Sequence, residues 1–197
     1  MDVTWQHPFS AIVSGPSGCG KTQFTLRFID HLPHMVKPNI EKVMWCYGIY
    51  QELFDKYPQI QFQEGHPDLS IFDGKERTLL VLDDLMAETD ERVTMLFTKI
   101  SHHKNVSILY LTQNLFYKSK HMRTISLNAH YLVLFKNVRD STQVANLARQ
   151  MFPGKSHFMI EAFAGYLLVD LTSASDERCR LRTNIFPGET HYVYMRK

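Results

Sequence analysis

Eight residues near the start of the chain have the types and spacing of a phosphate-binding loop. The stretch from Gly15 to Thr22 reads GPSGCGKT and fits the pattern G-x-x-x-x-G-K-[ST]. It follows an apolar run at 11–14 and precedes a helical pattern, which is the context in which this motif binds nucleotides. Glycines let backbone N–H groups converge on phosphate oxygens, and the N-terminus of the following helix adds partial positive charge. The loop therefore predicts a nucleotide site.

Every residue of this loop is expected to contact the bound nucleotide. The set is Gly15, Pro16, Ser17, Gly18, Cys19, Gly20, Lys21 and Thr22. Lys21 would reach the β- and γ-phosphates and act in catalysis, and the hydroxyl of Thr22 would ligate Mg²⁺. We therefore expect ATP and Mg²⁺ as cofactors.

A second candidate group is a pair of acids at the end of an apolar run. Residues 79–84 read LLVLDD, the pattern of a Walker B strand downstream of a phosphate loop. Asp83 would hold the Mg²⁺ shell, and Asp84 would polarise an attacking water as general base. The alternative is a strand that simply ends in turn-forming aspartates. A second acid beside the metal ligand favours hydrolysis by water over phosphoryl transfer to another substrate.

A third candidate is an amide at the end of the next apolar run. Residues 106–114 read VSILYLTQN and place Gln113 directly after a strand. Open α/β sheets bind ligands at the carboxyl ends of their strands. If this strand lies between those that carry the loop and Asp83, Gln113 faces the γ-phosphate or the attacking water. The alternative for Gln113 is a plain strand-end turn.

The elements that must position these groups alternate along the chain, as in an α/β protein whose parallel sheet is covered by helices. Near-continuous apolar character predicts strands buried on both faces. The predicted strands are 11–14, 42–48, 78–84, 106–112 and 130–136, and the predicted helices are 20–32, 49–57, 88–103 and 140–151.

The end of the chain has a different pattern, with two strand-like runs, GYLLVDLTSA and ETHYVYMR, which we expect to pair with each other. The sequences FPGK and FPGE beside them predict turns. With no linker between these parts, residues 1–197 are expected to form one domain, with a core at about 9–152 and an extension at about 153–197.

Composition narrows the class of protein. Hydrophobic residues make up 44% and charged residues 21%, a globular balance. The three cysteines, Cys19, Cys46 and Cys179, have no paired spacing, which argues against a disulfide framework or a zinc site. The sequence contains no apolar run long enough for a membrane span and no signal-peptide pattern. We expect a protein of a reducing compartment, with no membrane partner.

Two basic runs are candidate contacts for a polyanion. Lys118, Lys120, His121 and Arg123 follow the third candidate strand, and Arg178, Arg180 and Arg182 lie near the C-terminus. The first run could face nucleic-acid phosphates or be a solvated loop. On a strand, the three C-terminal arginines would share one face, which could line a pore, form a subunit interface or be plain surface, with surface as the default interpretation.

Several blocks resemble the FtsK–HerA superfamily of ATPases, and more closely the genome-packaging ATPases of Polinton/Maverick elements, adintoviruses and related viruses. These blocks are SGPSGCGKT, VLDDL, SHHKNVSILYLTQNLF, RTISLNAHYLVLFKNVRD and RLRTNIFPGE, which together span about residues 9–189. The resemblance implies the additional-strand class of P-loop NTPases, with strand order 5-1-4-3-2. It also implies a homo-oligomeric ring that threads double-stranded DNA into a capsid, at the assembling virion in the host cytoplasm or nucleus, with a capsid or portal partner.

The resemblance further implies a basic finger that completes each active site from the neighbouring subunit. The position where relatives commonly carry arginine holds Lys104, and Arg123 and Arg139 are rivals for this role. A lysine supplies charge but not a bidentate fork. The second Walker B acid is Asp84 where many relatives carry glutamate.

Two other functions fit parts of the pattern. A small-molecule P-loop kinase would need a mobile arginine-rich lid, which the sequence does not offer. A nucleotide-dependent scaffold that docks a capsid would hydrolyse ATP slowly, which Asp84 and Gln113 argue against.

Overall fold

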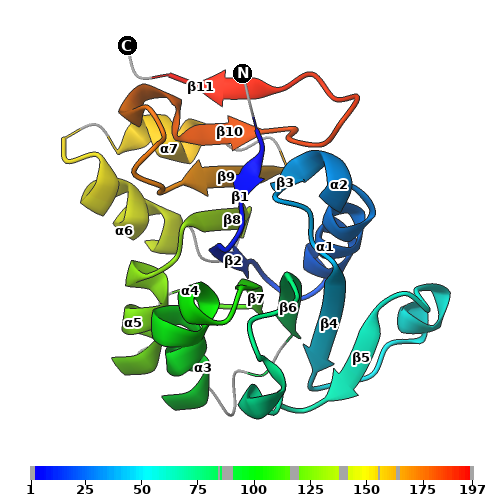
Figure 1. Cartoon of the computed structure of the whole chain (residues 1–197). Helices are drawn as coiled ribbons and strands as arrows, with labels where there is room; N and C mark the ends of the chain where they lie inside the picture. The colour runs from blue at the N-terminus through cyan, green and yellow to red at the C-terminus, as the bar shows by residue number, and fades with distance from the viewer. Residues whose placement is uncertain are drawn as a thin grey trace.

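The computed structural model of the chain describes residues 3–83, 85, 91–115, 120–137, 142–154, 156–162 and 165–195. Within these residues the fold is built on a nine-stranded sheet with the order β11-β10-β9-β8-β2-β7-β6-β4-β5 (Figure 1). Its strands are β2 (Ser10–Ser14), β4 (Lys42–Tyr47), β5 (Gln61–Glu64), β6 (Thr78–Asp83), β7 (Val106–Thr112), β8 (Tyr131–Phe135), β9 (Tyr166–Asp170), β10 (Leu181–Thr183) and β11 (Tyr192–Tyr194).

The sheet is mostly parallel, as expected for an α/β protein. The parallel part of the sheet consists of β8, β2, β7, β6, β4 and β5. Beside β8, antiparallel pairing adds β9, β10 and β11. The five predicted strands are all present and differ from their predicted bounds by at most one residue at either end. They lie in the order β8-β2-β7-β6-β4, which reads 5-1-4-3-2 when the five are numbered along the chain.

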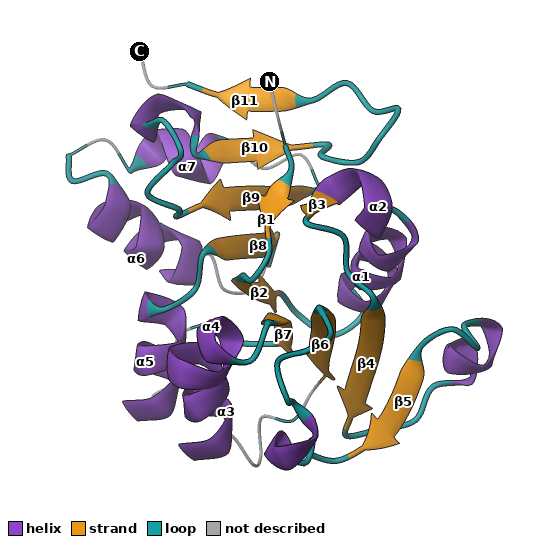
Figure 2. Cartoon of the chain, viewed as in Figure 1, coloured by secondary structure: helices purple, strands orange, loops and turns teal. Residues whose placement is uncertain are grey.

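Helices cover both faces of this sheet (Figure 2). The helical elements are α1 (Lys21–Asp30), α2 (Leu32–Met35), α3 (Glu91–Met95), the π-helical turn η4 (Leu96–Ile100), α4 (Ser101–His103), α5 (Lys120–Leu127), α6 (Thr142–Met151), α7 (His157–Glu161) and the short 3-10 helices η1 (Glu52–Lys56), η2 (Leu69–Ile71) and η5 (Glu177–Cys179). A separate parallel pair joins β1 (Trp5–Gln6) to β3 (Val36–Lys37). None of the described helices is both long and apolar enough to cross a membrane.

The core lies in two layers, one on each face of the sheet. On β7, Ile108 and Tyr110 point into the layer that α3, α5, α6 and α7 cover. Leu109 and Leu111 point into the opposite layer, which α1 covers with Phe24, Leu26, Phe28 and Ile29. Burial on both faces explains why this strand is an unbroken apolar run instead of an alternating one.

The helix predicted at 49–57 is wrong, because this segment forms only the 3-10 helix η1. The segment stops at Pro58, so it has too few residues to propagate an α-helix. Phe54 is buried and holds the segment against the sheet through tertiary packing. The turns predicted at 152–155 and 186–189 are confirmed at their described residues, and Gly154 and Gly188 both have a left-handed backbone.

The predicted pairing of the two C-terminal runs is also wrong. Strand β10, which the sequence analysis did not identify, lies between β9 and β11 and pairs with both. The three C-terminal arginines do not share a strand face, because Arg178 lies in η5 and only Arg182 lies in β10. Asp176 accepts a hydrogen bond from the backbone N–H of Arg178, which starts η5 in place of a longer strand.

Candidate functional site

The loop from Gly15 to Thr22 leaves the carboxyl end of β2 and enters α1. The N–H of Gly15 donates to the carbonyl of Thr112 at 3.1 Å, which ties the start of the loop to the end of β7. Gly18 and Gly20 have φ angles of 74° and 100°, a left-handed backbone that favours glycine. A side chain at Gly15 would place its Cβ 2.6 Å from the Cβ of Phe135, so this position also needs glycine.

Lys21 lies back over this loop. Its Nζ donates to the carbonyls of Gly15 at 2.7 Å and Pro16 at 3.0 Å. These two bonds hold the ammonium group beside the loop, and the side chain is partly buried. Thr22 is the second residue of α1, whose first backbone N–H groups have no intrahelical partner. A cation, a hydroxyl and the positive end of a helix therefore lie together, which suits an anionic phosphate chain.

Asp83 and Gln113 lie beside this loop, at the same edge of the sheet. Asp83 is the last residue of β6, and Gln113 follows the last residue of β7. The side chain of Asp83 is buried, with 7% of the residue exposed. Because β7 lies between β2 and β6, the carboxyl ends of the three strands meet at one edge.

A cavity of about 490 Å³ opens at this edge and brings most of the predicted residues together. Its lining includes the loop residues Ser17, Gly18, Gly20, Lys21 and Thr22, together with Gln23, Ile49, Gln51, Leu53, Asp83, Leu111 and Gln113. Gly15 lines a smaller neighbouring cavity that Gln113 also reaches. Pro16 and Cys19 lie in the loop itself and do not line either cavity.

The donors in this cavity suit Mg²⁺ better than a transition metal. Thr22 and Asp83 offer oxygen atoms, and Mg²⁺ is typically held by one or two such ligands together with waters and substrate phosphates. Within the described part of the chain, no cluster of three or more His, Cys, Asp or Glu side chains could hold a metal ion. The described cysteines are all free thiols.

Among the remaining predicted residues that the structure describes, Arg123 and His121 do not line this cavity. Asp84 and Arg139 lie outside the described residues, as does Lys118. Arg123 lies exposed on α5. His121 is 3.0 Å from the hydroxyl of Thr94 through its Nδ1, so it contacts α3.

Lys104 lies at the opposite edge of the sheet from the cavity. It follows α4 and precedes the first residue of β7, and its side chain is exposed. Strand β7 has 7 residues, which at about 3.3 Å each separate Lys104 from Gln113 by roughly 20 Å. Lys104 is therefore too far from the cavity of its own chain to contact a ligand there.

Sequence reasoning missed the wall formed by residues 49–53. Ile49 and Gln51 line the cavity from the segment between β4 and η1, and Leu53 lines it from η1 itself. Ile49 is 73% exposed, which is unusual for an isoleucine beside a polar cavity. The only available signal was position, since the segment follows the carboxyl end of a central strand.

Comparison with known proteins gives a fold but no family. No family model matches the chain, and no curated protein sequence is significantly similar. Among solved structures, the chain is similar to the genome packaging NTPase B204 from Sulfolobus turreted icosahedral virus 2. Its complex with ATP-gammaS superposes with a TM-score of 0.57 at 12% identity over 85% of this chain and 94% of that chain. Its complex with AMP gives 0.56 at 11% identity over 95% and 96%. The chain thus shares the α/β fold of a viral genome packaging NTPase.

Proposed function

We propose that this protein binds and hydrolyses ATP to drive double-stranded DNA into a capsid, as a motor of the FtsK–HerA type. The observation that carries the proposal is the convergence of three side chains on one cavity: Lys21 from the start of α1, Asp83 from the end of β6 and Gln113 from just after β7. A phosphate loop, an acid and an amide at the ends of neighbouring parallel strands are the set that water-driven hydrolysis needs.

Each residue has a distinct task in this proposal. Lys21 exchanges its bonds to the carbonyls of Gly15 and Pro16 for bonds to the β- and γ-phosphates. Thr22 and Asp83 hold Mg²⁺, which would neutralise charge on the phosphates. Asp84 takes a proton from the attacking water, and Gln113 orients that water against the γ-phosphate.

The packaging role rests on two supports of different kinds. Sequence blocks over about residues 9–189 resemble the packaging ATPases of Polinton/Maverick elements and related viruses. Independently, the fold is similar to that of a viral genome packaging NTPase. We accordingly assign the chain to the additional-strand class and place it in a homo-oligomeric ring at the assembling virion, in the host cytoplasm or nucleus. Double-stranded DNA and a capsid or portal protein are its proposed partners.

The position of Lys104 favours catalysis between subunits over catalysis within one. Because it lies at the opposite sheet edge from its own cavity, its exposed ammonium group is available to the cavity of a neighbouring chain. Arg123 is the rival on a described surface, and Arg139 is the rival outside the described residues.

The test is steady-state ATP hydrolysis with and without long double-stranded DNA, beside the Lys21→Ala variant. Stimulation by DNA that weakens steeply with added salt is expected, since contacts to DNA phosphates release counterions. ATP turnover that depends on a small-molecule phosphate acceptor and is not stimulated by DNA would contradict the motor function and favour a kinase. Slow hydrolysis that responds to capsid protein alone would favour a scaffold.

A further inference from the structure

A second cavity adjoins the phosphate loop on the outer face of α1. Its volume is about 450 Å³, and it shares Gly20 and Gln23 with the cavity that holds Lys21 and Asp83. Its wall on α1 includes Gln23, Arg27 and Asp30, whose spacing places them on one face of the helix. A molecule that extends past the first turn of α1 from the phosphate loop therefore enters this second cavity, which we call the α1 groove.

The α1 groove is bordered by aromatic side chains from distant parts of the chain. Phe24 comes from α1, Phe135 from β8, Tyr166 from β9, Phe186 from the turn after β10, and Tyr57 from the segment after η1. Phe24 contacts three of the other rings, with centroid distances of 6.0 Å to Phe135, 4.9 Å to Tyr166 and 5.2 Å to Phe186.

These rings are not all core residues. Phe24 and Phe186 are buried, at 5% and 1% exposed. Tyr57, Phe135 and Tyr166 are only partly buried around the groove. Burial raises the pKa of Tyr166 to about 12, so its phenol stays neutral at physiological pH. Neutral, partly exposed aromatic surfaces suit a flat ligand that stacks, because every nucleobase has a π-face.

Phe135 connects the groove to the phosphate loop. Its Cβ lies 2.6 Å from the position that a Cβ on Gly15 would take, and its ring lies 3.8 Å from the corresponding position at Gly20. The ring is therefore packed against the backbone that would hold the phosphates. A base on this ring is within reach of a triphosphate in the loop.

A fixed cation completes the groove. The guanidinium of Arg27 lies 4.1 Å from the ring centroid of Phe186, and its Nη1 donates to Glu189 Oε1 at 2.7 Å. Glu189 also accepts the backbone N–H of Phe186 at 3.2 Å, so one carboxylate joins the turn to the helix. The C-terminal extension thereby forms part of the groove wall.

Resting on the proposed function, we infer that the α1 groove binds the purine base of the nucleotide whose phosphates lie in the Gly15–Thr22 loop, with Phe135 as its principal stacking surface. The occupant follows from continuity, because the two cavities share Gly20 and Gln23 at the start of α1. The C-terminal strands are then part of the nucleotide site and not only an extension of the sheet.

The test compares two ligands on the full chain by isothermal titration calorimetry, MgATP and magnesium tripolyphosphate. Tripolyphosphate occupies a phosphate site but carries no base. Wild-type protein is expected to bind MgATP more tightly than tripolyphosphate. Phe135→Leu keeps an apolar side chain but removes the ring, and is expected to weaken MgATP about 5- to 100-fold while leaving tripolyphosphate unchanged. Tyr192→Leu, on the exposed strand β11, is the matched control and changes neither affinity.

The possible failures are distinguishable. If wild-type protein binds tripolyphosphate as tightly as MgATP, or Phe135→Leu binds MgATP like wild type, the base site is wrong and the phosphate loop stands. Equal loss of both ligands in Phe135→Leu means that the ring only supports the loop, which also overturns the inference. If Phe135→Leu does not fold, Tyr57→Leu is scored by the same criteria.

Two further results are decisive. If wild-type protein binds neither ligand, the proposed function itself fails. A change of oligomeric state in Phe135→Leu, measured by light scattering and with MgATP affinity intact, would make the groove a contact between chains instead.

Discussion

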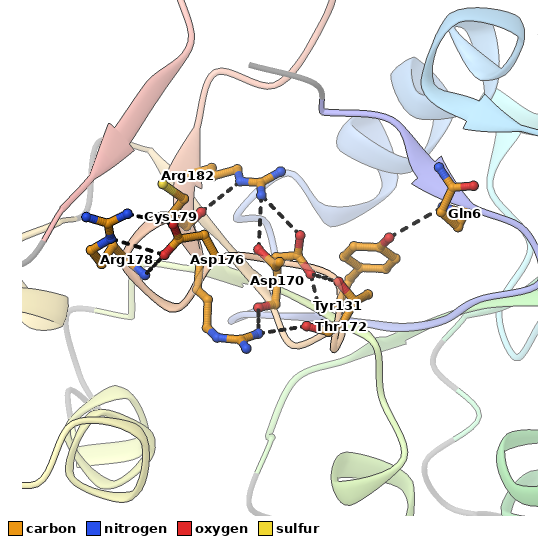
Figure 3. A network of polar contacts seen from close by, with 10 residues as sticks. Gln6, Tyr131, Asp170, Thr172, Asp176, Arg178, Cys179 and Arg182 are labelled. Carbon is orange, nitrogen blue, oxygen red and sulfur yellow. Dashed lines mark hydrogen bonds and ion pairs between the residues drawn. The ribbon is translucent and has the colours of Figure 1, made fainter.

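Polar side chains are used differently in the parallel and the antiparallel parts of the sheet. In the parallel part, β2, β7 and β6 end at one edge, and Lys21, Gln113 and Asp83 line an open cavity there. In the antiparallel part, Asp170 and Arg182 bind each other at 3.2 Å with side chains only 8% and 11% exposed (Figure 3).

Two further arginines beside the antiparallel strands, Arg178 and Arg180, also have partners within the chain. Arg180 donates to the carbonyls of Asp170 and Thr172, each at 2.9 Å, and Arg178 pairs with Asp176. Parallel strands place all their carboxyl ends on one side, where groups remain accessible to a ligand. Antiparallel neighbours place carboxyl and amino ends alternately on that side. In this protein the charged residues of the antiparallel part bind one another. Substitutions of the polar residues at the cavity should therefore change chemistry, and substitutions of the paired charges in the antiparallel part should change stability.

The largest effect is expected at the cavity. Lys21→Ala should abolish nucleotide binding, because it removes the cation beside the loop. Asp84→Asn should bind ATP but hydrolyse it about 10²- to 10⁴-fold more slowly, since it removes the general base. Filter binding of labelled ATP and single-turnover hydrolysis separate the two results. Wild-type turnover by Asp84→Asn would disprove its assignment as the base.

The next effect tests whether the cavity is complete within one chain. Lys104→Ala should slow hydrolysis about 10²-fold in assembled protein, since it removes one cation from the neighbouring site. It should leave ATP affinity of the isolated chain unchanged, because Lys104 lies at the far edge of the sheet. Mixing Lys104→Ala with Asp84→Asn chains should restore some active sites. No recovery at any mixing ratio would exclude a finger that acts between subunits, and Arg123→Ala is the comparison variant.

The sequence predicted the parallel part of this comparison well, for an identifiable physical reason. Strands that are buried on both faces need unbroken apolar runs, so β7 and its neighbouring strands could be recognised in the sequence as apolar runs. The residues at their ends could then be placed without knowing any tertiary contact. Lys21, Thr22, Asp83 and Gln113 were all brought to one cavity. Their catalytic roles stay predictions.

The antiparallel part was poorly predicted because its signals are short or distant. Strand β10 is only Leu-Arg-Thr, and its pairing depends on β9 and β11 instead of on a local pattern. Similarly, the α1 groove joins Phe24 to Tyr166 and Phe186, which are far apart in the chain. Such sites are formed by tertiary packing between distant segments, and this packing cannot be read from a single sequence.

A stability effect of intermediate size is expected at the buried ion pair. Asp170→Asn should lower the free energy of unfolding by about 3 kcal/mol, because it leaves the guanidinium of Arg182 buried without its carboxylate. The exposed pair between Asp176 and Arg178 is the control, and Asp176→Asn should cost less. Urea unfolding measures both variants. Equal costs would show that burial does not distinguish the two pairs, and lost hydrolysis in folded Asp170→Asn would break the division between the two parts.

The smallest effect concerns His7, at the edge of the sheet opposite the cavity. His7 is 8% exposed, with Nδ1 2.6 Å from the hydroxyl of Ser107 and Nε2 3.0 Å from Asn105 Oδ1. Burial is the largest effect and lowers its pKa. The hydrogen bond to Asn105 and the charge of Glu41 raise the pKa, and Arg77 lowers it, and the net shift is downward.

A lowered pKa means that the unfolded chain binds the proton more readily than the folded chain. The stability that neutral His7 contributes is therefore full above about pH 6.5, the ordinary histidine value, and is lost as pH falls through the folded-state pKa. His7→Gln should be less stable at neutral pH but lose less stability on acidification. The measurement is the difference between the wild-type and variant unfolding free energies across this range. A difference that does not vary with pH would mean that His7 has the same pKa in the folded and unfolded states and contributes only its hydrogen bonds.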